Sequence, residues 1–281
     1  MPTIPIYFQR DLPPTTPNPS STTLPIRNHK FPTPTLRLHL NDLSHEGSSI
    51  FLSSFHGNED FETQIQNVLN LLYTPSCKRP GTRSVTLVLR QMNGVAYTTG
   101  TELDEDHKEI HFSLNYITSA AKSKPSVRDE ILGVVCHELV HCFQYSAEGT
   151  CPGGLIEGVA DWVRLRAGLA AKHWRQEADG KWDAGYQHTG YFLEYLEQRF
   201  GPGTVRRMNG CLREGKWDEG RVFKECCEGK KVEGLWEEYR EELKRKKERE
   251  GKKEGKQEEI ETPPEPIPTH DPSREWGGPD T

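Results

Sequence analysis

The stretch DEILGVVCHELVHCFQYSAEGTCPGGLIEGVADWVRLRAG, residues 129–168, contains a spacing that bears on both the architecture and the chemistry of the chain. In its first half, His137 and His141 flank Glu138 in the pattern H-E-x-x-H. Residues four apart on an α-helix lie one turn apart on the same face, so both imidazoles can reach one ion. Glu138 lies about 100° round the helix, so its carboxylate can contact a water on that ion without being a ligand.

The second half of the stretch offers a third metal ligand. A catalytic zinc site takes three protein ligands and keeps one position open. The turn GTCPGG (149–154) is expected to bring the next helix back beside the first, with Glu157 near the two histidines. The next histidine, His173, lies beyond the expected end of that helix. Asp161 follows Glu157 by one turn, where it can accept the N–H of a ligand histidine and fix its tautomer.

The H-E-x-x-H pattern alone has a simpler interpretation, an ordinary buried helix whose two histidines are satisfied within the core. The helix has enough apolar residues for burial, namely Ile131, Val134, Val135, Leu139 and Phe143. The metal site is favoured because the motif, the acidic third ligand, the turn between the helices and the supporting Asp161 occur together.

A zinc ion held by two histidines and a glutamate predicts a hydrolytic role. Two neutral imidazoles and one carboxylate leave the ion with a net charge of about +1, which lowers the pKa of its bound water toward ~7. Glu138 is expected to take the proton from that water and to pass it to the leaving amine. The developing oxyanion needs a further donor. Its candidates lie in GYQHTGYF (185–192), and they are Tyr186, His188 and Tyr191.

The segments before these helices are mostly strand-like. Apolar residues on one helical face predict a helix over 61–73. Segment 109–117 has two interpretations, since an edge strand beside the metal helix can bind an extended peptide by backbone pairing, whereas an internal strand belongs to the core. Alternating or β-rich runs predict strands over 35–40, 48–55 and 84–92, and a hairpin of 94–101 with 109–117.

Helices take over beyond Lys124. Ser126 is expected to cap a helix over 127–147. Further helices are expected over 155–171 and 185–200, with shorter ones to about residue 245. Strands first and helices afterwards predict an α+β domain rather than repeated βαβ units.

The two ends of the chain differ in composition from its middle. Residues 1–32 are rich in proline and threonine and predict a disordered leader. Residues 33–243 are expected to form one domain. Residues 244–281 mix charges with glycine and proline and predict a disordered tail.

The charge and hydropathy of the chain limit the kinds of partner that we expect. The formal net charge is -6, so nucleic acid is not an expected partner. No apolar run approaches the ~18 residues that span a bilayer, so no membrane partner is expected either. We expect a peptide or protein substrate and a monomeric protein. The N-terminus lacks the features of a signal peptide, which predicts a cytoplasmic protein with non-classical secretion as an alternative.

Several segments together resemble the plant basic secretory protein family and its fungal relatives, a family of HExxH-type zinc metallopeptidases. The resemblance covers residues 34–243, and its glycine-rich block around Glu157 is far more specific than HExxH. It is carried by MNGVAY (92–97), EIHFSLNYI (109–117), HELVHCFQ (137–144), PGGLIEGVADWVRLRAG (152–168) and WDAGY (182–186).

The resemblance implies a zincin-like α+β domain, in which a small mixed sheet packs on the HExxH helix and a helical C-terminal part follows. It implies Glu138 as the base and three zinc ligands, His137, His141 and Glu157. Tyr186 falls at the tyrosine of the family segment GY-x-x-T-A-x-F-L-x-Y, where Gly190 replaces the alanine. The chain departs from the family in its slightly acidic pI of about 6.0 and in the lack of a secretory signal.

We therefore expect a zinc-dependent peptidase that hydrolyses peptide bonds with Glu138 as general base. The alternative from another class is a metal-stabilised binding protein without catalytic activity. The presence of Glu138 argues against this alternative, because a purely structural metal site has no use for a base.

Overall fold

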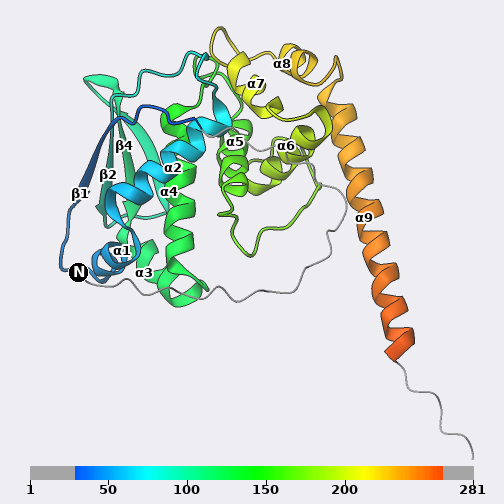
Figure 1. Cartoon of the computed structure of the whole chain (residues 1–281), viewed down its shortest axis with the longest axis horizontal. Helices are drawn as coiled ribbons and strands as arrows, with labels where there is room; N and C mark the ends of the chain where they lie inside the picture. Colours follow the sequence, from blue (N-terminus) through cyan, green and yellow to red (C-terminus); the bar gives the residue numbers. More distant parts are fainter. Residues whose placement is uncertain (1–28, 262–281) are drawn as a thin grey trace, which may run out of the picture.

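The structure is a computed structural model that describes residues 29–261, with side chains described up to residue 249 (Figure 1). Most of the predicted leader (1–28) and the end of the predicted tail (262–281) lie outside the described residues. Phe31 falls within the predicted leader, yet its side chain is buried in the core. Its backbone N–H and C=O both bond to the side-chain amide of Gln66, at 2.8 and 2.9 Å, so packing onto the domain begins before residue 33.

A four-stranded sheet forms one side of the molecule (Figure 1). Strands β1 and β2 are parallel, as are β2 and β4, whereas β3 and β4 are antiparallel. The sheet is therefore small and mixed, which confirms this part of the expected α+β fold. The strands follow one another across the sheet in the order β1 (Thr35–Leu40), β2 (Ser84–Arg90), β4 (Asp104–Ser113) and β3 (Ala96–Thr101).

The strand order decides between the two interpretations of segment 109–117. Its strand, β4, is paired on both sides and is internal. The edge position belongs to β3, the first strand of the hairpin. The internal interpretation therefore holds for residues 109–113, because β2 pairs with β4 over Ser84–Arg90 and His107–Ser113.

The strand predicted over 48–55 is also wrong, since these residues lie in helix α1 (Glu46–Ser54) apart from Phe55. The buried residues Ser48 and Phe51 are three apart, which fits a helix rather than an alternating strand. The ring of His45 caps α1 by accepting the N–H of Gly47 at 3.0 Å.

The second half of segment 109–117 turns into a helix as well. Strand β4 ends at Ser113, whose hydroxyl accepts the backbone N–H of Tyr116 at 3.2 Å. This cap starts α3 (Leu114–Ser123), so Leu114 and Tyr116 belong to a helix and not to the predicted strand.

Helices cover one side of the sheet, as Figure 1 shows for α1, α2 (Gly57–Leu72), α3 and α4 (Val127–Phe143). Helix α4 begins where the sequence predicts, because the hydroxyl of Ser126 accepts the N–H of Asp129 at 3.2 Å. Most of its residues are buried, since it contacts β3 and β4 on one side and α5 on the other. The H-E-x-x-H motif thus lies at the centre of the domain.

The C-terminal half is helical, as expected. Helix α5 packs mainly against α4 and α6, and α7 and α8 follow above them in the view of Figure 1. The bounds are α5 (Gly153–Arg166), α6 (Tyr186–Phe200), α7 (Thr204–Cys211), α8 (Glu219–Cys226) and α9 (Val232–Glu261).

Helix α9 continues well beyond residue 243 and projects away from the other helices (Figure 1). Leu243 is its last buried residue, and residues 244–249 are exposed. The structure therefore gives residues 244–261 a helical form, where the sequence predicts a disordered tail. Glutamate, lysine and arginine are good helix formers, and pairs such as Arg245 with Glu241 support a helix without burial.

Candidate metal centre

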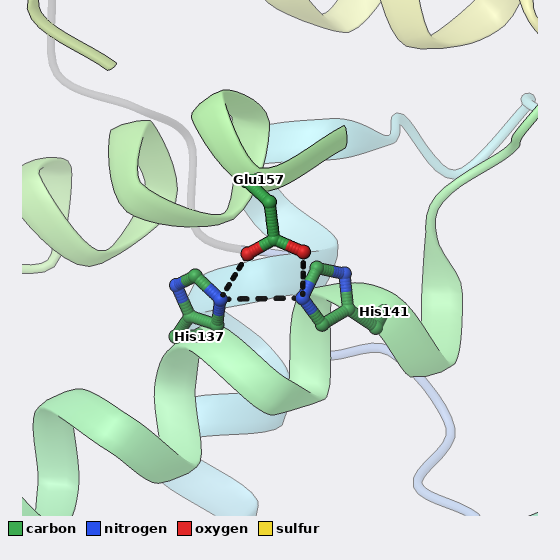
Figure 2. A group of neighbouring side chains, drawn as sticks. All are labelled: His137, His141 and Glu157. Carbon is green, nitrogen blue, oxygen red and sulfur yellow. Dashed lines mark hydrogen bonds and ion pairs between the residues drawn. The ribbon is translucent and has the colours of Figure 1, made fainter. Parts of the chain in front are cut away.

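Two glycines let α5 approach its neighbours closely. A Cβ atom at Gly154 would overlap the backbone carbonyl of Asp183, and one at Gly158 would overlap the side chain of Thr189. Helix α6 and the segment before it are therefore in direct contact with α5. Helix α5 contacts both α6 and α4. Its Glu157 side chain points toward the two histidines of α4 (Figure 2).

The side chains of His137, His141 and Glu157 converge between α4 and α5 (Figure 2). The Nε2 atom of His137 lies 3.2 Å from Nε2 of His141 and 3.1 Å from Oε2 of Glu157. The Nε2 atom of His141 lies 3.7 Å from Oε1 of Glu157. With bond lengths of about 2.0–2.1 Å, the ligand atoms of tetrahedral zinc lie about 3.3–3.4 Å apart, so these spacings are close to those that one such ion needs.

Each imidazole also has a partner on its other nitrogen. Oδ1 of Asp161 lies 2.7 Å from Nδ1 of His137, which is buried with it. The side-chain amide of Gln144 lies 2.9 Å from Nδ1 of His141. If each histidine binds a metal ion through Nε2, its proton stays on Nδ1. Asp161 would then accept the Nδ1–H of His137. Gln144 would accept the Nδ1–H of His141, which requires its amide oxygen to face that ring.

The charges of the cluster are coupled. Burial would lower the pKa of His137, but hydrogen bonds with Asp161 and Glu157 raise it to about 9. Burial and the neighbouring His137 lower the pKa of His141 to about 4. Burial would raise the pKa of Glu157, but its hydrogen bond with His137 holds that pKa below the ordinary value. The metal-free cluster at neutral pH thus holds a protonated His137 between two carboxylates.

Glu138 is buried next to the cluster and contacts β3. Burial raises the pKa of its carboxyl group, while His137 and Thr98 act to lower it. The hydroxyl of Thr98 lies 2.7 Å from Oε2 of Glu138. The sequence alone does not single out Thr98, because only the strand pairing shows that this position of β3 faces α4.

A cavity of about 940 Å³ lies over the cluster. Its wall includes β3, α4, α5, the start of α6 and the segment 171–174. The residues with the most direct bearing on chemistry are Thr98, His137, Glu138, His141, Glu157 and Tyr186.

Of the three predicted oxyanion donors, only Tyr186 lines this cavity. Tyr186 is 57% exposed, and its ring stacks on the imidazole of His137 with a centroid distance of 6.2 Å and an interplanar angle of 14°. The ring of His188 packs instead on Trp236 at 5.2 Å, and Tyr191 contacts Trp174 at 6.5 Å. The structure thus places His188 and Tyr191 outside the cavity over His137, His141 and Glu157.

The fold and this cluster define an α+β protein with a candidate metal site at the wall of a cavity. A family model described as a peptidase of plants and bacteria, the BSP model, matches residues 33–239. The chain therefore belongs to the basic secretory protein family, a peptidase family. Comparisons with curated proteins and with solved structures found no match. Within the part of the chain that the structure describes, no helix is long and apolar enough to cross a membrane.

Proposed function

We propose that this protein is a zinc-dependent peptidase that hydrolyses peptide bonds with Glu138 as general base. The observation that carries the proposal is the convergence of His137, His141 and Glu157 within one cavity, beside a buried glutamate that is not part of the cluster. Membership of a peptidase family supports the reaction class. The proposed zincin type rests on the H-E-x-x-H helix followed by an acidic third ligand on the next helix.

The donor set favours zinc. Two imidazole nitrogens and one carboxylate oxygen form a known catalytic zinc set, which leaves a fourth position open. Cys136 and Cys142 are buried on the same helix but do not belong to the cluster. A bound zinc ion supplies Lewis acidity, which acidifies water and polarises a carbonyl group.

The side chains around the cluster have distinct proposed tasks. Asp161 orients His137 through its Nδ1 atom, so that Nε2 faces the site. Glu138 accepts a proton from the attacking water and delivers it to the leaving nitrogen. Tyr186 is the proposed donor to the oxyanion, since its ring lies at the cavity above His137.

The edge strand β3 offers a place for the substrate. Its residues Ala96 and Thr98, which share one face of the strand, line the cavity, and its outer side is unpaired within the described residues. An extended peptide can pair with such an edge through its backbone. We therefore propose that β3, rather than β4, holds the peptide substrate across the site.

The test is cleavage of a quenched fluorescent peptide library by the zinc-loaded full chain and by Glu138→Gln. The proposal predicts cleavage by the wild type and a loss of about 10²–10⁴-fold in Glu138→Gln, with its zinc content unchanged. Glu177→Gln, an exposed change far from α4 in the sequence, should cleave like the wild type. Zinc binding by a wild type that cleaves no peptide would instead support the non-catalytic binding protein.

A further inference from the structure

Thr98 makes a two-point contact with Glu138. Its hydroxyl oxygen lies 2.7 Å from Oε2 of the Glu138 side chain and 3.0 Å from the backbone carbonyl oxygen of the same residue. In the described part of the chain, the other carboxylate oxygen of Glu138, Oε1, has no hydrogen-bond partner. One oxygen of the carboxylate is therefore held toward β3, while the other is left available to the cavity.

The position of this hydroxyl is fixed by the sheet and not by α4. Thr98 pairs with Ile110 of β4, which is fully buried. Its neighbour Tyr97 points to the opposite face, where it stacks on His111 with a centroid distance of 4.6 Å. Threonine is β-branched and has few side-chain rotamers, so a fixed strand gives a fixed hydroxyl.

The side chain of Glu138 is long, so its carboxylate needs a partner that fixes its direction. A glutamate side chain has three rotatable bonds, and burial alone does not select one direction for its carboxylate. A hydrogen bond from a neutral donor to a charged acceptor is among the stronger ones in proteins. The strand that we propose to hold the peptide would thus also fix the direction of the base.

We propose that Thr98 is a positioning residue for the hydrolytic reaction, which holds the carboxylate of Glu138 in the orientation that proton transfer requires. This proposal rests on the peptidase function proposed above. Within the described residues, the Thr98 hydroxyl bonds to Glu138 and not to His137, His141 or Glu157, so its proposed effect passes through Glu138.

The test compares Thr98→Val, which keeps the shape, with Thr98→Ser, which keeps the hydroxyl. With the zinc-loaded full chain and one cleaved peptide, Thr98→Val should lower kcat by about 10–100-fold while KM stays within about twofold. Thr98→Ser should recover most of kcat. Thr63→Val, at an exposed position of α2 that does not line the cavity, is the control and should behave like the wild type.

Zinc content and melting temperature show whether Thr98→Val is folded and loaded. If Thr98→Val is unfolded or lacks zinc, Thr98→Ala is measured in its place, because it removes the hydroxyl without adding a new methyl contact. The same changes in kcat and KM are then expected of Thr98→Ala. Crystal structures of the zinc-free proteins give a readout besides activity. We expect one rotamer of the Glu138 side chain in the wild type and in Thr98→Ser, and several rotamers in Thr98→Val.

Wild-type kcat in a folded, loaded Thr98→Val variant would overturn the positioning role and leave the peptidase function in place. An equal loss in Thr98→Val and Thr98→Ser would also overturn it, because the hydroxyl would then not be the group that matters. A wild type that cleaves nothing would overturn the peptidase function and the positioning role together.

Discussion

Asp161 and Glu157 lie one helical turn apart on α5, and both contact the imidazole of His137, at Nδ1 over 2.7 Å and at Nε2 over 3.1 Å. One helix therefore supplies both a proposed metal ligand and the group that orients another ligand. We therefore expect the affinity of this site for a metal ion to depend on how α5 packs against α4.

Replacing Asp161 by asparagine should weaken zinc binding. Asparagine keeps the shape but loses the charge that orients His137, and such partners typically contribute about 10–100-fold to metal affinity. Competition with a chromogenic chelator measures the change. Asp179→Asn, at an exposed position, is the control. An unchanged affinity in Asp161→Asn would show that His137 does not depend on this carboxylate.

Zinc binding should release about one proton per chain at pH 7.5, because the raised pKa of His137, about 9, keeps it protonated in the metal-free protein. His141, with a pKa of about 4, is already neutral at this pH. Zinc affinity should therefore rise with pH up to about 9 and level off above it. Calorimetry in buffers of different ionisation enthalpy measures the proton count. Zinc binding without proton release at pH 7.5 would contradict the coupled cluster.

Gly154→Ala should disturb both the fold and the site. The added methyl group would overlap the carbonyl of Asp183, and overpacking of this kind costs about 1–3 kcal/mol of the free energy of unfolding. Gly153→Ala, at the adjacent position, is the matched control, because a Cβ atom there would meet nothing within 4 Å. Urea denaturation and zinc content measure both variants. Equal stability of the two variants would refute the close approach at Gly154.

Tyr186→Phe should lower kcat by up to about 10²–10³-fold with little change in KM, if its hydroxyl stabilises the oxyanion. Tyr191→Phe and His188→Gln should leave kcat unchanged, since neither residue lines the cavity. Steady-state kinetics on one peptide compares the three. A loss of kcat in Tyr191→Phe but not in Tyr186→Phe would place the oxyanion donor elsewhere.

The candidate site was accessible from the sequence because helical periodicity is a local property. The spacing of His137 and His141, and that of Glu157 and Asp161, fixes which side chains share a face before any tertiary contact is known. The meeting of the two faces also needed only a short turn, GTCPGG. The side chains of the three candidate ligands, His137, His141 and Glu157, therefore lie together as the spacing predicts.

Other parts of the structure depend on tertiary contacts that local patterns do not contain. Residues 48–54 form a helix because His45 caps it and Phe51 is buried against the core, and the serine-rich run itself favours neither form. The edge position of β3 follows from the strand order. Thr98 could not be found from the sequence for the same reason, since its bond to Glu138 joins residues 40 apart.

The most direct measurement is the zinc content of the purified full chain by elemental analysis, for the wild type, Glu138→Gln and Glu157→Ala. The proposed site predicts about one zinc ion per chain in the wild type and in Glu138→Gln, and a loss of bound zinc in a folded Glu157→Ala. A folded wild type that binds no zinc, or a Glu157→Ala variant that keeps it, would contradict the assignment of His137, His141 and Glu157 as a metal site.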